Sequence, residues 1–304
     1  MSQLIAVVKA FSLPFIPKQN LNRTNPIRLV KIGVMDAKTA PDPFLDFKSR
    51  QREMWGTFAP VAQFTTPVAG QLVKFAGISP GEKVLDVGTG TGVVAITAAR
   101  SGAQATGLDL TPALLQQARE NSRIARTENI VWTEGDAEDL PYPDGSFDVV
   151  LSQFGHIFAP RPEMAVSEIR RVLRPGGRFA FATWPPEHFV GRFFAFIGRH
   201  SPVPPIGEPP VLWGNPTVIA ERLATRFDRL FFRRGMMTFP ALSMEHYRLF
   251  MESSVGPMQK LVEALAASPE KLASIRAEFE ELAKPYYQDN EIQQDYLLTL
   301  AKAA

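Results

Sequence analysis

The sequence predicts an α/β fold with a doubly wound, mostly parallel sheet. From about residue 78, short apolar stretches typical of strands alternate with amphipathic stretches typical of helices. A glycine-rich turn at residues 88–92 joins the first strand to its helix, as in ligand-binding sheets of this class. The 304 residues are 45% hydrophobic and 21% charged, which matches an ordinary globular protein. These observations indicate an α/β core.

The first part of the core follows a regular strand and helix order. The sequence predicts strands at residues 83–87, 104–110, 130–134, 147–152 and 178–183. Helices are predicted at residues 93–100, 112–126 and 161–173. Alternation at this spacing requires right-handed crossovers between parallel strands.

The later part of the chain departs from this order. Residues 185–210 are rich in Pro, Phe and Gly and indicate an insertion rather than a regular crossover. Beyond it we expect a helix at 216–227, a strand at 230–238, one or two helices in 243–284, and a strand or helix at 292–301. The predicted organisation is a basic extension (1–45), a core (46–242) with an insertion (185–215), a helical lid (243–290) and a last core element (291–304).

Composition excludes several classes of protein and site. Cys is absent, which removes disulfides, zinc–thiolate sites and cysteine nucleophiles. The four His show no metal-ligand spacing, so no metal site is expected. A net charge of +2 is too balanced for a nucleic-acid partner, and no apolar run approaches the roughly 20 residues of a membrane span.

Residues 1–34 differ from the rest because they contain basic but no acidic side chains. Lys9 interrupts the apolar stretch that a secretory signal peptide would need, so we expect a cytoplasmic protein. A surface arm, an organelle transit peptide and a natural start at Met35 remain open interpretations of this segment.

The glycine turn is compatible with two cofactors. Residues 84–92 read V-L-D-V-G-T-G-T-G, and the pattern also satisfies the dinucleotide fingerprint G-x-G-x-x-G/A. Asp86, two residues before Gly88, would repel a pyrophosphate, whereas the sulfonium and ammonium groups of S-adenosylmethionine would favour a carboxylate. Charge therefore favours S-adenosylmethionine, and an NAD(P)-dependent oxidoreductase is the alternative.

Two further carboxylates follow the next strands. Asp109 ends the second predicted strand, where an acidic side chain can accept hydrogen bonds from both hydroxyls of a ribose. Asp136 follows the third strand, where an adenine amino group would lie. Each alone could be a helix cap or turn residue, but three acids in register with the glycine turn predict a nucleoside site.

Four ordered segments resemble the motifs of class I S-adenosylmethionine-dependent methyltransferases, in particular the ubiquinone and menaquinone biosynthesis branch. They are V-L-D-V-G-T-G-T-G, G-L-D-L-T-P-A-L-L, E-G-D-A-E-D-L-P and I-R-R-V-L-R-P-G-G-R-F. The resemblance covers about residues 58–184 and implies a seven-stranded sheet whose last strand is antiparallel. It also implies cofactor contacts for Asp86, Gly88, Thr89, Gly90, Gly92, Asp109, Leu110, Asp136, Ala137, Gln153 and Phe154, with Trp55, Phe58 and Thr65 closing over the cofactor.

The sequence restricts the methyl acceptor without identifying it. Residues 152–155 read S-Q-F-G rather than the Asn/Asp-Pro-Pro-aromatic motif of amino-methylating enzymes, and Cys-dependent methylations are excluded. A small hydrophobic or aromatic acceptor remains, methylated on O, N or C, and a non-catalytic S-adenosylmethionine-binding protein is a further alternative. His156 is the candidate base, although it could simply pack beside the pocket. The oligomeric state is not predicted.

Phe189, Phe193, Phe194 and Phe196 could line an acceptor pocket or form an ordinary core face. The same two interpretations hold for an apolar stripe in the predicted lid, whose members are Met244, Tyr247, Phe250, Met251, Met258, Leu261 and Leu265.

Overall fold

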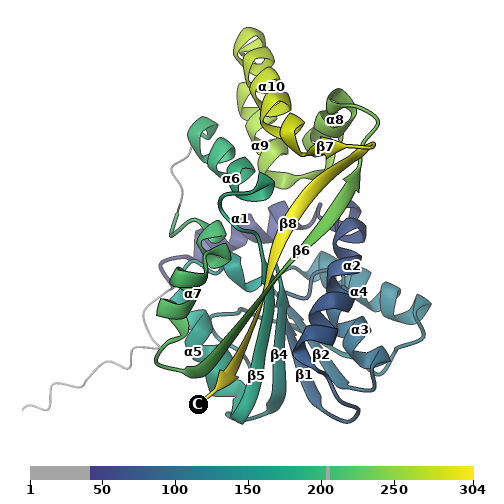
Figure 1. Cartoon of the computed structure of the whole chain (residues 1–304), viewed down its shortest axis with the longest axis vertical. Coiled ribbons are helices and arrows are strands. Elements are labelled where there is room, and N and C mark those ends of the chain that lie inside the picture. The colour runs from purple at the N-terminus through teal and green to yellow at the C-terminus, as the bar shows by residue number, and fades with distance from the viewer. Residues whose placement is uncertain (1–41, 203–205) are drawn as a thin grey trace, which may run out of the picture. The chain divides into compact units, whose positions relative to one another are not determined.

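The computed structural model describes residues 42–202 and 206–304, which form an α/β core with helices gathered beyond one end of its sheet (Figure 1). The expectations for residues 1–34 and Met35 lie outside the described residues. Residues 42–304 form one structural unit. No helix in the described ranges is long and apolar enough to cross a membrane.

The sheet has the predicted mixed topology. Its strands follow the order β3-β2-β1-β4-β5-β8-β6, and the short β7 pairs with β8. Strands β1 to β5 all run parallel to one another, whereas β8 is antiparallel to both of its long neighbours, β5 and β6. The predicted fold class is therefore confirmed. The strands are β1 (Lys83–Val87), β2 (Gln104–Asp109), β3 (Val131–Glu134), β4 (Phe147–Gln153), β5 (Leu173–Thr183), β6 (Phe227–Pro240), β7 (Tyr287–Gln288) and β8 (Glu291–Ala303).

Helices cover both faces of the sheet and one of its ends. The helices are α1 (Leu45–Trp55), α2 (Ala59–Ala76), α3 (Val93–Arg100), α4 (Pro112–Ile124), α5 (Pro162–Val172), α6 (Phe189–His200), α7 (Pro216–Leu223), α8 (Met244–Ser254), α9 (Gly256–Leu265) and α10 (Pro269–Ala283). Short 3-10 turns are η1 (His156–Phe158), η2 (Pro210–Gly214) and η3 (Lys284–Tyr286).

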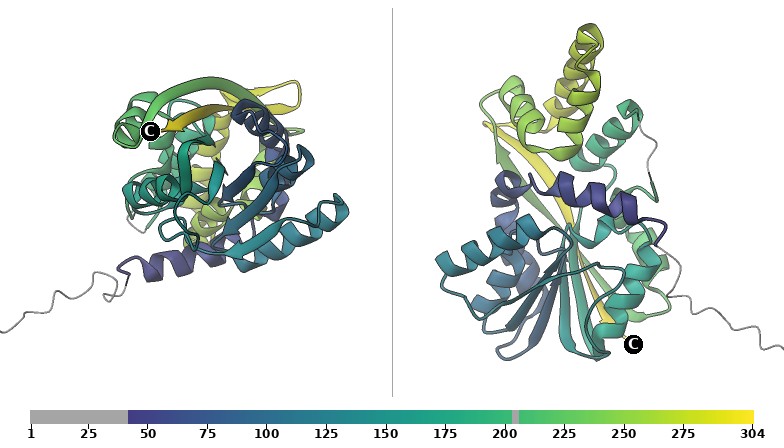
Figure 2. Two further views of the ribbon diagram at one scale, coloured as in Figure 1. Left: turned by 90° about the horizontal axis from the view of Figure 1, so that it is seen from below. Right: turned by 180° about the vertical axis from the view of Figure 1, so that it is seen from behind.

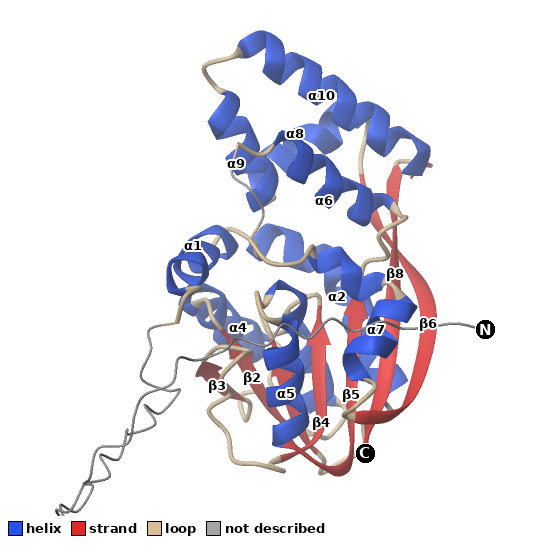
Figure 3. Ribbon diagram, turned by 90° about the vertical axis from the view of Figure 1, so that its left-hand side faces the viewer, coloured by secondary structure: helices blue, strands red, loops and turns tan. Residues whose placement is uncertain are grey.

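The three largest apolar clusters among the described residues hold this arrangement together. One lies between the sheet and α5 and α7, and a second lies between the sheet and α2 and α3. The third joins α6 to α8, α9 and α10 beyond the end of the sheet, and includes Phe193, Tyr247 and Phe279 (Figure 3). The helices from α8 to α10 bury their apolar faces against α6 and one another rather than against the sheet alone.

Several late elements differ from the sequence interpretation. Residues 185–210, predicted as an insertion without an assigned helix, contain α6. Residues 243–284 form three helices instead of one or two, since Pro257 and Pro269 each begin a new helix. Residues 292–301 belong to strand β8, which settles the choice between strand and helix.

Candidate functional site

A pocket opens where the carboxyl ends of β1, β2 and β4 meet helix α1, which runs across these strand ends (Figure 2). It encloses about 900 Å³ of space, its open mouth included. Ten of the predicted site residues line this first pocket: Trp55, Phe58, Gly88, Gly90, Asp109, Leu110, Asp136, Ala137, Gln153 and Phe154. Asp86, Thr89, Gly92, Thr65 and His156 are absent from its wall.

The glycine turn lets two loops approach closely beneath the pocket. Gly88 has a φ of +67°, in the left-handed region that glycine tolerates. A Cβ at Gly88 would lie 2.7 Å from the Cα of Gly155 in the loop after β4. Only a residue without a side chain fits at this position, so the glycine is required by backbone proximity as well as by conformation.

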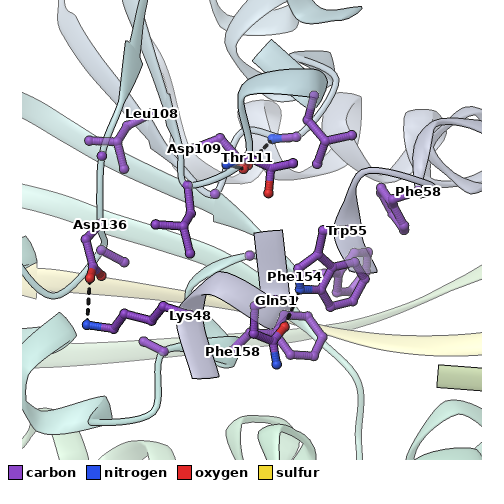
Figure 4. A pocket seen from close by; sticks show the side chains of 18 of the residues that line it. Lys48, Gln51, Trp55, Phe58, Leu108, Asp109, Thr111, Asp136, Phe154 and Phe158 are labelled. Atoms are coloured by element: carbon purple, nitrogen blue, oxygen red, sulfur yellow. Dashed lines mark hydrogen bonds and ion pairs between the residues drawn. The ribbon is translucent and has the colours of Figure 1, made fainter. Parts of the chain in front are cut away.

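Asp109 joins the end of β2 to the glycine turn (Figure 4). One carboxylate oxygen accepts a hydrogen bond from the backbone N–H of Gly90 and the other from that of Thr111, both at 2.8 Å. Burial raises the pKa of Asp109 and these hydrogen bonds lower it; burial is the larger effect, so the pKa is raised overall. Each carboxylate oxygen keeps lone-pair capacity beyond its single backbone donor, so the group can accept further hydrogen bonds from a ligand.

Asp86 lies beneath the glycine turn instead of beside the ligand space. Its Oδ2 accepts hydrogen bonds from the Thr89 hydroxyl at 2.5 Å and from the Ala95 N–H at 3.2 Å. Its Oδ1 is buried without a hydrogen-bond partner. Burial raises the pKa of Asp86 to about 7. Asp86 and Thr89 thus stabilise the glycine turn. Neither residue lines the first pocket, so Asp86 does not face the space where a sulfonium was expected beside it.

Lys48 on α1 is a prominent site residue that sequence reasoning missed. Its ammonium group forms ion pairs with Asp42, Asp136 and Glu138 at 2.5, 2.6 and 2.7 Å. Burial lowers the pKa of Lys48, but hydrogen bonds to these carboxylates outweigh burial and raise it overall. Asp136, expected near an adenine amino group, therefore already binds Lys48 (Figure 4).

Two other predicted residues connect elements around the pocket. The Gln153 side chain donates a hydrogen bond to the backbone oxygen of Thr65 at 3.0 Å, which ties β4 to α2. The Trp55 indole donates to the Gln51 side chain at 2.6 Å within α1. Gln51 and Phe158 also line the pocket, and nothing in the sequence pattern distinguishes either from an ordinary helix or loop residue.

The structure buries His156 away from the walls of the first and second pockets. The side chain is 1% exposed and packs edge-on against Phe179, Phe181 and Trp213, with ring centroids 5.3, 4.9 and 4.7 Å away. Burial and the nearby Arg222 lower its pKa to about 3. The imidazole is absent from the walls of both pockets described here, so its surroundings match the packing interpretation rather than that of a base.

A second pocket adjoins the first and shares Trp55, Phe58 and Trp184 with it. It encloses about 780 Å³, open mouth included, between α1, α2, α6, β6 and α8. The Phe154 and Trp184 rings stack at 4.0 Å, so one aromatic pair contributes to both walls. Besides the shared Trp55 and Phe58, the residues named from the sequence that line the second pocket are Thr65, Phe189, Phe193, Phe194, Tyr247, Phe250 and Met251.

The predicted apolar stripe and phenylalanine cluster are thus each divided between pocket and core. Phe196 instead packs against Phe279, and Met258, Leu261 and Leu265 are buried among the lid helices.

The charges of the first pocket indicate which ligand fits it. Among described residues its wall carries the charged groups Lys48, Asp109 and Asp136, and Lys48 is already held by carboxylates. A pyrophosphate would meet buried carboxylates without a free cation to bind it. A nucleoside with a cationic end fits better, because its positive charge would be attracted to the carboxylates that repel a pyrophosphate. Asp109 can accept hydrogen bonds from the ribose hydroxyls of either ligand.

Comparisons with known proteins agree with this geometry. A family model described as a methyltransferase domain matches residues 85–181. An uncharacterized protein of Mycobacterium tuberculosis is 36% identical over 256 residues, which are 83% of this chain and 93% of that protein. A demethylmenaquinone methyltransferase of Tropheryma whipplei is 42% identical over 130 residues, which are 42% of this chain and 52% of that enzyme.

Solved structures show the same fold. The crystal structure of a Bacillus halodurans protein has a TM-score of 0.53 at 21% identity and covers 77% of this chain and 97% of that one. That of the YcgJ protein of Bacillus subtilis has a TM-score of 0.52 at 18% identity, with coverage of 77% and 97%. The chain belongs to the class I S-adenosylmethionine-dependent methyltransferases, and S-adenosylmethionine is its cofactor.

Proposed function

We propose that the protein transfers a methyl group from S-adenosylmethionine to a small, uncharged, hydrophobic or aromatic acceptor. The observation that carries this proposal is the second pocket, whose described wall contains no Asp, Glu, His, Lys or Arg side chain. An apolar wall of this kind favours burial of an apolar ligand and disfavours a charged one that finds no partner.

The first pocket supplies the residues that would hold the cofactor. Asp109 would accept the ribose hydroxyls, and Leu110 and Ala137 offer apolar surface for the adenine ring. Gly88 and Gly90 would border the methionine end. When bound, S-adenosylmethionine supplies an electrophilic methyl group, and the shared residues Trp55, Phe58 and Trp184 mark where the acceptor would meet it.

The chain's own contribution to the reaction is positioning in a dry site. The acceptor's nucleophilic atom would form a bond to the methyl carbon as the carbon–sulfur bond breaks, with the bonding electrons staying on sulfur. No ionisable group that could act as a base at neutral pH lines the second pocket among the described residues. The acceptor would therefore react either through the lone pair of a neutral amine, which loses its proton to water after the transfer, or as the minor ionised form of an otherwise uncharged phenol or enol, which loses its proton to water before it enters. An anion would be neutralised by the methyl transfer, which an apolar environment promotes.

The name of one relative supports an aromatic acceptor. The Tropheryma whipplei enzyme is called a demethylmenaquinone methyltransferase, and the similarity to it covers only 42% of this chain.

The lid segment (243–290), which we propose to cover the acceptor, is a separate source of specificity. The cytoplasmic location also stays a prediction.

The two alternatives are not favoured. An NAD(P)-dependent oxidoreductase would need pyrophosphate binding beside Asp109 and above the buried Asp86. A non-catalytic S-adenosylmethionine-binding protein would give no product, so turnover separates it from an enzyme.

The proposal can be tested with trideuteriomethyl S-adenosylmethionine and metabolite extracts separated into apolar, anionic and cationic fractions. We expect one labelled product in the apolar fraction, formed by the wild type and by Asp228→Ala, an exposed carboxylate change on β6. Asp109→Ala should form much less of it. Labelled product confined to the anionic or cationic fraction would contradict the proposed acceptor class.

A further inference from the structure

Two of the polar side chains in the mainly apolar wall of the second pocket form a hydrogen-bonded pair. Tyr247 on α8 is 1% exposed and Gln294 on β8 is 9% exposed, and both line the pocket. The Gln294 side-chain amide donates a hydrogen bond to the Tyr247 hydroxyl oxygen at 3.1 Å. Within the described part of the chain, neither the Tyr247 hydroxyl proton nor the Gln294 side-chain oxygen has a partner.

Polar groups with unused hydrogen-bonding capacity on the wall of a mainly apolar cavity can bind a polar group of a ligand there. Burial raises the pKa of Tyr247, so its phenol keeps the proton at neutral pH and can act as a donor. Because the hydroxyl oxygen accepts from Gln294, its proton is directed elsewhere. The pair thus offers one donor and one acceptor to the same cavity.

The ring of Tyr247 is held in place by its neighbours. It packs against Phe189, Phe239 and Phe279 with ring centroids 5.9, 5.3 and 6.0 Å away. The polar pair belongs to the part of the wall that the second pocket does not share with the first, whereas Trp55, Phe58 and Trp184 form the shared part. A group bound by Tyr247 and Gln294 is therefore distinct from the atom that would be methylated at the shared wall.

We propose that Tyr247 and Gln294 select acceptors carrying a neutral oxygen function, a carbonyl or hydroxyl, at a position separate from the methylated atom. This inference rests on the proposed function. Tyr247 donates to the oxygen of either function, and the Gln294 side-chain oxygen accepts from a hydroxyl. The expected acceptors are therefore uncharged, mainly apolar molecules that carry one such oxygen. A purely hydrocarbon ring system would bind more weakly, because it makes no hydrogen bond to Tyr247 or Gln294.

The test uses matched naphthalene probes with the full chain. 2-Acetylnaphthalene carries a ketone, 2-isopropylnaphthalene replaces it by a hydrocarbon of similar shape, and both are titrated calorimetrically at saturating S-adenosylhomocysteine, which is intended to fill the first pocket. Tyr247→Phe should weaken ketone binding roughly 3- to 10-fold and leave hydrocarbon binding within about twofold. Tyr287→Phe is the control, because its hydroxyl donates to the Leu242 backbone oxygen outside the pocket.

Gln294→Leu is a second variant. It should also reduce the difference in affinity between the ketone and the hydrocarbon probe, because the Tyr247 hydroxyl loses the donor that orients it. Equal weakening of both probes, or unchanged ketone affinity in a folded Tyr247→Phe protein, would overturn the inference, as would failure of both probes to bind the wild type. Binding of S-adenosylhomocysteine is measured separately in the same instrument. If it fails while the probes still discriminate, the proposed function is wrong but the oxygen-recognising pair stands.

Discussion

Replacing Asp109 by Ala tests how the first pocket recognises a nucleoside. The carboxylate has one backbone donor on each oxygen at 2.8 Å, which leaves room for two charge-assisted hydrogen bonds from a ribose. Each is worth about 1.5–3 kcal/mol, and the lower value alone corresponds to about tenfold in affinity. Asp109→Ala should therefore weaken S-adenosylmethionine binding at least about tenfold.

The variant also leaves the N–H groups of Gly90 and Thr111 without their acceptor, which could loosen the turn by itself. Calorimetry with S-adenosylhomocysteine and its 2′,3′-dideoxy analogue separates the two effects, because loosening weakens both ligands alike. Removing the hydroxyls should cost the wild type at least about tenfold and Asp109→Ala less than about threefold. An equal cost in both proteins would refute the ribose assignment, and Asp228→Ala should behave as wild type.

Three further changes probe the surroundings of the pocket. Lys48→Met leaves Asp136 without its cation, whereas Asp42 and Glu138 keep their ion pairs with Arg161. We therefore expect a loss of about 2 kcal/mol in the free energy of unfolding, and little change for exposed Arg50→Met; equal effects in denaturant melts would contradict this role. Asp86 has its pKa raised to about 7 by burial, so the folded state binds the proton more tightly and stability from this group falls as pH rises from about 4 to 7. Asp86→Asn should remove this dependence of the unfolding free energy on pH. If the unfolding free energies of variant and wild type changed with pH in parallel, the Asp86 carboxylate would be ionised over the whole range and its pKa would not be raised. His156→Ala should lower stability by about 2–4 kcal/mol through a cavity and leave cofactor affinity unchanged; a folded variant with normal stability but altered pH dependence of turnover would restore the catalytic interpretation.

Much of the first pocket's wall was predictable because its residues lie near strand ends. The glycine turn, Asp109 and Asp136 lie at the ends of β1, β2 and β3, which are parallel neighbours in the sheet. Residues at the same ends of neighbouring parallel strands lie close together, and these line one pocket. The orientation of Asp86 was not predictable in this way. Its carboxylate turns to the Thr89 hydroxyl and the first turn of α3, and a sequence motif carries no information on that choice.

Contacts between distant parts of the chain could not be predicted. In the first pocket, Lys48 pairs with Asp136 and Glu138 across a long sequence separation, and no local period or spacing encodes such a pair. The second pocket combines residues from α1, α2, α6, α8 and two strands, and its polar pair joins Tyr247 to Gln294 through tertiary packing. The same stripe of apolar lid residues supplies both core and pocket, which helical spacing alone cannot separate.

The most direct measurement of the central claim is the NMR spectrum of S-adenosylmethionine carrying a ¹³C-labelled methyl group, bound to the full chain. If the cofactor lies in the first pocket with its methyl group at the shared wall, that methyl should show nuclear Overhauser effects to the aromatic protons of Trp55, Phe58 and Trp184. Its resonance should also be displaced by their ring currents. A bound methyl group without contacts to these three rings, or no binding at all, would contradict the claim that the two pockets are the two halves of a methyl-transfer site.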